Sequence, residues 1–258
     1  MMDMTEFTAP STRQISGTQS IGRAIDILRV IASNGRRGYR LDDIANKALL
    51  SKTTCARILN RLCTERVIRK EPVSGRYCLG PLVHELALLA RPDYSLVDQL
   101  TPMLKRLADV TQDTVYLSEL RGLDAVCTAC QTGAYPIKVV PLDAGLRRPL
   151  GVAAGGLAIL ATLPETEADR ILNSIGSGYR NYEPGGEPRV RELLRATRTR
   201  GYAIEPSYGA PGATSISIGL PLAEPAASIT VTAINSRMAD GRKEEIVALM
   251  QDEIARAF

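Results

Sequence analysis

The chain has 258 residues, of which 45% are hydrophobic, so it can form one large or two small domains with buried cores, and it is not expected to be disordered. It contains no run of about 18 uncharged apolar residues, so no membrane-spanning helix is expected. The formal net charge is +4, and residues 51–80 hold seven basic and two acidic residues, so the positive charge is concentrated there. A basic patch on a nearly neutral body predicts contact with a polyanion, with a solvated helix face as the alternative.

The N-terminal segment, residues 1–18, is polar and contains acidic side chains. It lacks the apolar core of a signal peptide. We therefore expect a flexible arm there, no targeting segment, and a cytoplasmic location.

Two helices are predicted next. Apolar residues recur with helical spacing over 21–31, with Ser20 as the expected N-cap and Gly35 as the expected stop. A second stripe covers 41–48, where Asp42 is the expected cap.

A third helix and a β-hairpin follow. Apolar residues over 55–63 form one helical face behind the N-cap Ser51. Residues 67–70 and 76–79 are typical of two short strands, and the intervening EPVSG is typical of a turn. Three short helices and a basic hairpin over residues 19–80 predict a winged helix-turn-helix domain.

The third helix has small polar and basic side chains at its N-terminal end, the part of a recognition helix that enters a DNA major groove. Arginine and lysine are the usual partners of guanine edges and phosphates, and the hairpin can reach flanking phosphates. The predicted DNA contacts are Ser51, Lys52, Thr53, Thr54, Arg57, Arg61, Arg69, Lys70 and Arg76. A helical module that docks a protein partner is the alternative.

The rest of the chain mixes helices and strands. We expect helices over 81–92, 95–112, from about 152, and over 165–175, 188–200 and 243–258, and strands over 114–122, 124–132, 202–205, 214–221 and 228–233. The fold class is therefore α+β, with one central sheet in the C-terminal region. The predicted organisation is an arm (1–18), a winged helix-turn-helix (19–80), a linker helix (81–94) and an α+β domain (95–258).

Metal binding and catalysis have weak support. The five cysteines are an odd number, which argues against a disulfide framework. Cys127 and Cys130 form a single CxxC on a predicted strand, where residues three apart face opposite sides, so we favour a structural role and leave a redox role open. His84, on the predicted linker helix, is the only histidine, so no Ser–His or Cys–His pair is available and we expect neither an enzyme nor a cofactor or metal.

With these elements in place, the first eighty residues resemble the DNA-binding domain of the isocitrate lyase regulator (IclR) type transcription factors. The resemblance lies in Leu41/Ile44/Ala45, in Lys52-Thr53-Thr54 with Arg57-Ile58-Leu59 and Leu62, and in Tyr77/Leu79/Gly80. One departure is Leu49, at a turn position that usually holds glycine. Because a leucine with positive φ costs about 1 kcal/mol or more, we expect the turn to be built differently here.

The C-terminal half also resembles this family, which implies a GAF-like effector-binding fold. The matching segments are RRPLGVAAGGLAILA and GYAIEPSYGAPGATSISIGLPL. Departures are Gly151 and Leu157, where the family has His and Lys, and Thr214, where Arg is common. The resemblance implies effector contacts at Ala154, Gly155, Glu205, Ala213, Ser215, Thr230 and Thr232.

Two features of the residues themselves bear on this pocket. Small residues in GVAAGG let a helix N-terminus approach an anion, although close helix–sheet packing uses small residues equally well. Ser215, Thr230 and Thr232 recur with period two, so each strand can turn hydroxyls to one face.

The prediction is a ligand-responsive transcriptional regulator. Its partners would be a double-stranded DNA operator, a small organic acid as effector, and further copies of itself in a homodimer or homotetramer, with no membrane contact. The alternative is a small-molecule sensor that signals through protein partners instead of DNA.

Overall fold

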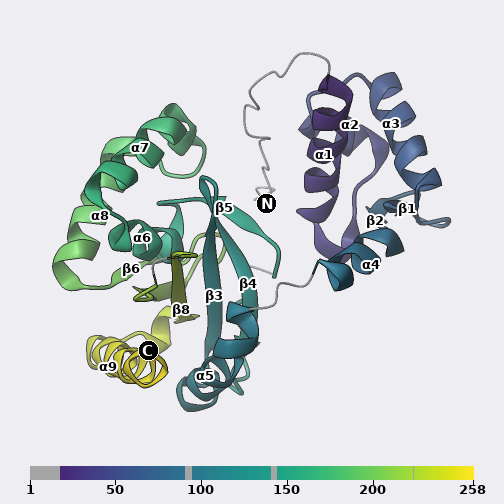
Figure 1. Cartoon of the computed structure of the whole chain (residues 1–258). Helices are drawn as coiled ribbons and strands as arrows, with labels where there is room; N and C mark the ends of the chain where they lie inside the picture. The colour runs from purple at the N-terminus through teal and green to yellow at the C-terminus, as the bar shows by residue number, and fades with distance from the viewer. Residues whose placement is uncertain (1–17, 91–94, 141–143, 223) are drawn as a thin grey trace. The chain divides into compact units, whose positions relative to one another are not determined.

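The computed structural model describes residues 18–90, 95–140, 144–222 and 224–258. The chain divides into two compact units, one before Ser95 and one from Ser95 onwards (Figure 1). The expected arm lies almost entirely outside the described residues, as does the end of the expected linker, residues 91–94.

Within the described residues, the N-terminal unit has three helices and a two-stranded wing, followed by a fourth helix. They are α1 (Gln19–Ala32), α2 (Leu41–Lys47), α3 (Lys52–Thr64), the antiparallel strands β1 (Ile68–Lys70) and β2 (Tyr77–Leu79), and then α4 (Pro81–Leu89). One apolar core joins the three helices and the wing through Ile27, Ile31, Ile44, Leu59 and Ile68, each at most 1% exposed. The predicted winged helix-turn-helix arrangement is therefore present.

Two helix starts differ from the expectation. The N-cap of α1 is Thr18, so Ser20 lies inside the helix and was wrongly assigned as its cap. Helix α2 already begins at Leu41, so Asp42 lies in its first turn, where a carboxylate also stabilises the helix dipole.

The turn between α2 and α3 keeps its left-handed residue. Leu49 has φ of +53° and is 83% exposed, so the expectation that this turn is built differently was wrong. Because most of the Leu49 side chain lies in solvent, it does not clash with the core, and the cost is confined to the backbone.

Leu49→Gly is therefore expected to raise the free energy of unfolding of the N-terminal unit by about 0.5–1 kcal/mol, since glycine adopts positive φ without strain. Chemical denaturation of the full chain measures it. Val73→Gly is the matched control, because Val73 is also exposed but is not among the residues with positive φ. A less stable Leu49→Gly chain would contradict the strain argument.

The C-terminal unit is built on a six-stranded antiparallel sheet in the order β5-β4-β3-β8-β7-β6. The strands are β3 (Thr114–Arg121), β4 (Asp124–Thr132), β5 (Arg147–Pro149), β6 (Ala203–Pro206), β7 (Ala213–Gly219) and β8 (Ala227–Ile234). The helices are α5 (Leu96–Thr111), α6 (Ala153–Thr162), α7 (Glu165–Ile175), α8 (Gly186–Arg200) and α9 (Asp240–Ala257). This confirms the predicted α+β class; β5 was not expected.

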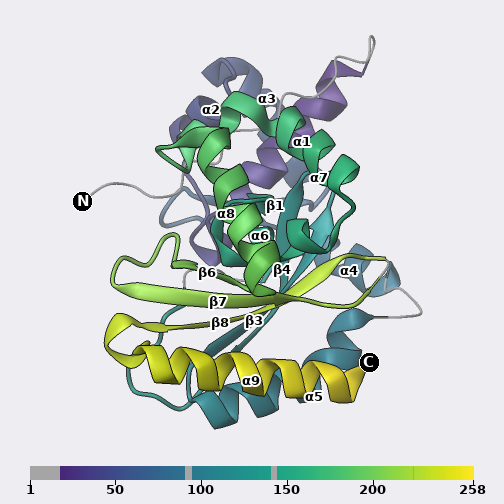
Figure 2. The same cartoon turned by 90° about the vertical axis from the view of Figure 1, so that its left-hand side faces the viewer.

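Helices cover both faces of the sheet. Helices α5 and α9 lie along one face and α6, α7 and α8 lie on the other (Figure 2). The α5/α9 face is apolar, with Ile216, Ile229 and Val231 fully buried. The two faces therefore have different chemistry, because the α6 face carries hydroxyl side chains.

The two cysteines of the CxxC do not face opposite sides as expected. Ser118 pairs with Cys127 and Tyr116 with Cys130, with a β-bulge between these pairs. Cross-strand partners share a face, so the bulge brings both cysteines to the side of Tyr116 and Ser118. Neither cysteine forms a disulfide with a described residue.

Candidate DNA-binding surface and effector pocket

Helix α3 presents its polar side outward. Ser51 caps it, its hydroxyl accepting from the Thr54 N–H at 3.3 Å, as predicted from the sequence. Cys55 and Leu59 are buried in the core, which leaves Ser51, Lys52, Thr53, Arg57 and Arg61 exposed and Thr54 half-buried. The predicted recognition residues of α3 therefore lie on one accessible helix.

Most of the basic side chains already have acidic neighbours. Lys52 Nζ lies 2.7 Å from Asp42 Oδ1, Arg61 pairs with Glu65, and Arg69 pairs with Glu71. Such exposed pairs contribute about 0–1 kcal/mol, so a phosphate can replace the carboxylate at little cost. Arg57 has no ionic partner within the described residues, which makes its guanidinium the most available one on α3.

The wing differs from the expectation in one residue. Arg69 and Lys70 are exposed, with Lys70 Nζ 5.4 Å from the centre of the Tyr77 ring. Arg76 is half-buried, and its Nη1 donates to the Gly38 carbonyl at 3.0 Å. Through this hydrogen bond Arg76 connects the wing to the loop before α2.

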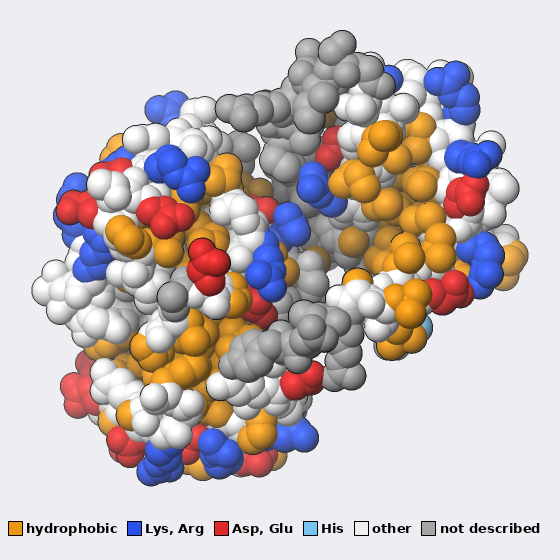
Figure 3. Space-filling view, viewed as in Figure 1, with side chains coloured by type: hydrophobic (Ala, Val, Ile, Leu, Met, Phe, Trp, Pro, Cys, Tyr) orange, Lys and Arg blue, Asp and Glu red, His pale blue; other side chains and the backbone are white. Residues whose placement is uncertain are grey.

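Sequence reasoning missed Arg23 on α1. It lines a groove of about 270 Å³ between α1 and α3, together with Arg57 and Arg61 on the other wall. The groove floor is apolar, and Figure 3 shows hydrophobic side chains on this unit bordered by Lys and Arg on the α3 side. Arg23 lies off the apolar stripe of α1, and helical periodicity gives no sign that a polar residue lines a groove.

In the C-terminal unit, hydroxyl side chains form rows across the sheet beneath α6. Ser215 is paired with Thr232, and Ser217 with Thr230. Thr230 in turn pairs with Tyr116 on β3, and two residues further along β3 Ser118 pairs with Ser228 on the same face. All these residues are buried. The period-two pattern of the two strands thus produces a continuous polar face inside the domain.

The internal hydrogen bonds use part of this donor capacity. Thr230 donates to Ser217 at 2.9 Å, Ser217 to the Ile229 carbonyl at 2.9 Å, and Ser228 to the Gly155 carbonyl at 3.0 Å. Ser215 and Thr232 share one hydrogen bond of 2.8 Å, which uses one of their two hydroxyl hydrogens. Within the described residues, one hydroxyl hydrogen of this pair is left without an acceptor beside the cavity that both residues line.

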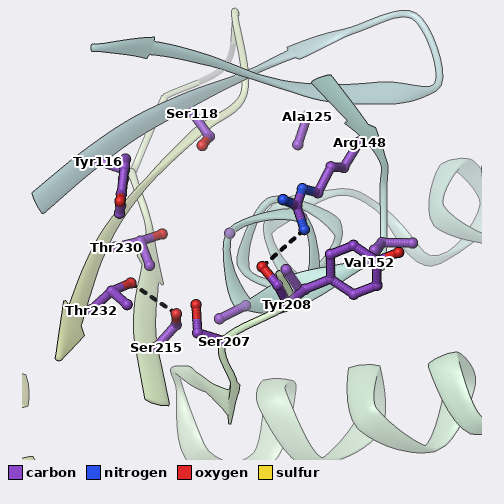
Figure 4. Close-up of a pocket in the computed structure, with 14 residues that line it drawn as sticks. Tyr116, Ser118, Ala125, Arg148, Val152, Ser207, Tyr208, Ser215, Thr230 and Thr232 are labelled. Carbon is purple, nitrogen blue, oxygen red and sulfur yellow. Dashed lines mark hydrogen bonds between the residues drawn. The ribbon is translucent and has the colours of Figure 1, made fainter. Parts of the chain in front are cut away.

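A cavity of about 40 Å³ lies between the hydroxyl face and the start of α6 (Figure 4). Its lining includes five of the seven residues that the resemblance implied, which are Ala154, Gly155, Ser215, Thr230 and Thr232. Ala213 is buried at the start of β7 and is not in the lining, and Glu205 lines a neighbouring cavity instead.

The small residues at the start of α6 serve both roles that the sequence left open. A Cβ on Gly156 would lie 2.9 Å from the Gly151 nitrogen, which shows close packing. A Cβ on Gly155 would lie 3.2 Å from Thr230 Oγ1, so glycine keeps space beside the hydroxyls. The α6 N-terminus also brings its partial positive charge to this space.

Arg148, which sequence reasoning missed, supplies a full positive charge. Its side chain extends from β5 to the cavity, where Nη1 donates to the Tyr208 carbonyl at 3.1 Å (Figure 4). The guanidinium carbon lies 4.3 Å from the centre of the Tyr208 ring. Burial lowers the pKa of Arg148, while the neighbouring Tyr208 raises it. Arginine still remains protonated at neutral pH, so the cavity holds a partly desolvated cation.

A second cavity of about 340 Å³ adjoins the first. Val152, Ala153, Ser207 and Tyr208 line both cavities and form the wall between them. The second cavity adds Tyr182, Glu183, Arg189 and Glu205 from the connection after α7, from α8 and from β6. Burial raises the pKa of Glu205, and Arg189 and Arg200 partly offset this effect.

Two features are absent from the part of the chain that the structure describes. No three His, Cys, Asp or Glu side chains group as metal ligands. Among the same residues, no helix combines the length and hydrophobicity needed to cross a bilayer.

A winged helix-turn-helix unit joined to a separate α+β unit, with a cavity that hydroxyl side chains line, defines a ligand-binding transcriptional regulator. The family model of the IclR helix-turn-helix domain matches residues 20–72, and that of the bacterial transcriptional regulator IclR C-terminal region matches residues 92–257. The chain belongs to the IclR family.

Named relatives agree with this assignment. The HTH-type transcriptional regulator BhcR of Paracoccus denitrificans is 29% identical over 246 residues, covering 93% of this chain and 85% of the relative. TtgV of Pseudomonas putida is 30% identical over 156 residues, 60% of this chain and 59% of that one. Both names describe regulators, which confirms the expectation that the chain is not an enzyme.

Solved structures share the fold. An IclR transcriptional regulator from Alicyclobacillus acidocaldarius has a TM-score of 0.73 at 23% identity, with 95% of this chain and 98% of that one covered. An IclR homologue from Microbacterium hydrocarbonoxydans, crystallised with 4-hydroxybenzoate, has a TM-score of 0.68 at 19% identity, with 92% and 97% covered.

Proposed function

We propose that this regulator binds an operator through α3 and the wing, and that a small organic acid in the cavity beneath α6 controls that binding. The observation that carries the proposal is the position of the Arg148 guanidinium in the same small cavity as the Ser215–Thr232 pair. A carboxylate satisfies both a buried cation and hydroxyl donors. The complex of the Microbacterium homologue with 4-hydroxybenzoate, which is also an acid, supports this class.

The regulator acts as an oligomer in this proposal. Apolar side chains are exposed on α1 and α4 of the N-terminal unit, among them Ile21, Ile25, Leu86 and Leu89. Covering such side chains with a second copy would place two recognition helices at a fixed spacing, as palindromic operators require. An effector that binds one arrangement better then shifts the populations by its difference in affinity. A cytoplasmic location accompanies this role.

Salt-dependent DNA binding tests the proposal. Duplexes selected from a random-sequence pool by the purified chain would be titrated at several salt concentrations, with and without short carboxylates. Each phosphate contact adds about −0.9 to the slope of log affinity against log salt, so a steep slope is expected. A flat slope, or no duplex binding, would favour a sensor that signals through protein partners.

Ser215→Val is expected to weaken the effector response about tenfold, because it removes one hydroxyl of the pair that faces the cavity. Effector-free operator binding should stay near that of the parent; Thr230→Val should behave similarly.

The readout is the acid concentration that half-releases operator DNA. Thr214→Val is the control, since Thr214 is the neighbouring residue on β7 but bonds Asn235 at 2.8 Å on the opposite side of the strand. Equal responses of Ser215→Val and parent would place the effector elsewhere.

A further inference from the structure

The two adjoining cavities differ sharply in size. A water needs about 10–15 Å³ of such space, so the 40 Å³ inner cavity holds on the order of three small atoms or groups. That is enough for a carboxylate and little more. The 340 Å³ outer cavity is within the range of small-molecule sites. A ligand larger than a bare carboxylate that binds beside Arg148 therefore extends out of the inner cavity, and the adjoining outer cavity has room for its remaining atoms.

The wall consists partly of a chain segment that Arg148 itself holds. Val152 and Ala153 belong to the start of α6, while Ser207 and Tyr208 lie between β6 and β7. The Tyr208 carbonyl accepts from Arg148, and its ring stacks on the guanidinium. A ligand carboxylate that competes with the Tyr208 carbonyl for Nη1 would loosen this side of the wall, while the guanidinium itself stays in place.

The outer cavity is lined by two glutamate side chains that can accept hydrogen bonds. Glu205 is opposite Ser215 in the sheet register, so it lies beside the hydroxyl row but lines the outer space. Glu183 lines the same cavity, and the rings of Tyr182 and Tyr208 lie 6.0 Å apart there. Arg189 also lines it, but its guanidinium binds Glu192 at 2.9 Å. A hydrogen-bond donor or a cation placed beside the half-buried Glu205 carboxylate would stabilise its charged form.

We propose that the effector is a bifunctional acid that spans both cavities, with its carboxylate on Arg148 in the inner cavity and an O–H or N–H donor on Glu205 in the outer one. The inference rests on the proposed effector function and names the ligand class. A hydroxy acid and an amino acid share this chemistry, and the experiment separates them.

The test uses the full chain and matched acids, with affinities from isothermal titration. One series is butanoate, γ-hydroxybutanoate and γ-aminobutanoate; the other is benzoate, para-hydroxybenzoate and para-(aminomethyl)benzoate. In at least one series the acid with a donor should bind about tenfold or more tighter than the plain acid. Glu205→Met should abolish that preference and change the affinity for the plain acid less than about twofold.

Glu205→Gln identifies the donor. Its amide oxygen still accepts from a hydroxyl, so the preference for a hydroxy acid should largely remain, whereas the preference for an ammonium group should be lost with the charge. Glu167→Gln is the control, since Glu167 is a half-buried residue of α7, outside both cavity linings, that pairs only with Arg170, at 3.7 Å, in the described chain. Thermal unfolding of each variant without ligand shows that it is folded.

Three results would overturn the inference: no acid of either series binds, no donor-bearing acid outbinds its plain counterpart, or the preference survives in Glu205→Met. If plain acids release operator DNA while donor-bearing acids bind no better, the proposed function stands and only the spanning ligand is wrong.

Discussion

Arg148→Met is expected to lower the affinity for an acid effector about 10- to 100-fold, because a hydrogen bond to a charged group contributes about 1.5–3 kcal/mol. The guanidinium is partly desolvated and already stacked on Tyr208, so it needs little reorganisation to accept a carboxylate. Methionine has a similar length and no charge, and it can still pack against the Tyr208 ring. The measurement is titration of the parent and the variant with the carboxylate that most raises the parent's melting temperature.

The neighbouring arginine provides the control. Arg147 lies on the same strand, but its Nη1 binds Asp124 Oδ2 at 3.1 Å and its side chain is not in the cavity lining. Arg147→Met removes the same charge one residue away and should leave effector affinity within about threefold of the parent. Equal losses of affinity in both variants would mean that Arg148 acts only through the net charge of the domain, and not through contact with the effector.

Sequence patterns predicted the hydroxyl face well, because alternation along a strand depends only on local geometry. Ser215, Thr230 and Thr232 reach the cavity for this reason. Arg148 was missed because β5 has only three residues and no alternation to show which side faces inward. Its place is set by pairing with Ala125 on β4, a long-range contact that no local pattern shows.

The same distinction explains the smaller errors. The bulge opposite Thr128 that brings Cys127 and Cys130 to one face arises from strand pairing, not from the CxxC spacing. The half-buried position of Arg76 depends on the Gly38 carbonyl, 38 residues away. Caps such as Ser51 were predictable because their partner lies three residues further on.

Arg57→Ala is expected to cost about 1–3 kcal/mol of operator binding, which is a loss of about 5- to 150-fold. Arg57 is exposed on the outward side of α3 and has no ion pair within the described residues. The other predicted contacts with an acidic partner must break that ion pair before they bind DNA; they are Lys52, Arg61 and Arg69. The contact of Arg57 with DNA is therefore opposed by no existing ion pair in the described chain. The measurement is a gel-shift titration on the selected operator and on a scrambled duplex.

The pattern of losses distinguishes the two roles that Arg57 can have. If it contacts a base edge, operator affinity falls while affinity for the scrambled duplex changes little; if it contacts a phosphate, both fall together and the salt slope decreases by about one. Arg29→Ala is the control, because Arg29 lies on α1 and pairs with Asp26 at 3.4 Å. An Arg57→Ala chain with parental affinity, specificity and salt slope would mean that α3 meets DNA in a different register. Arg23, on the α1 wall of the α1–α3 groove, would then be the next candidate for the contact, and Arg23→Ala would show the loss instead.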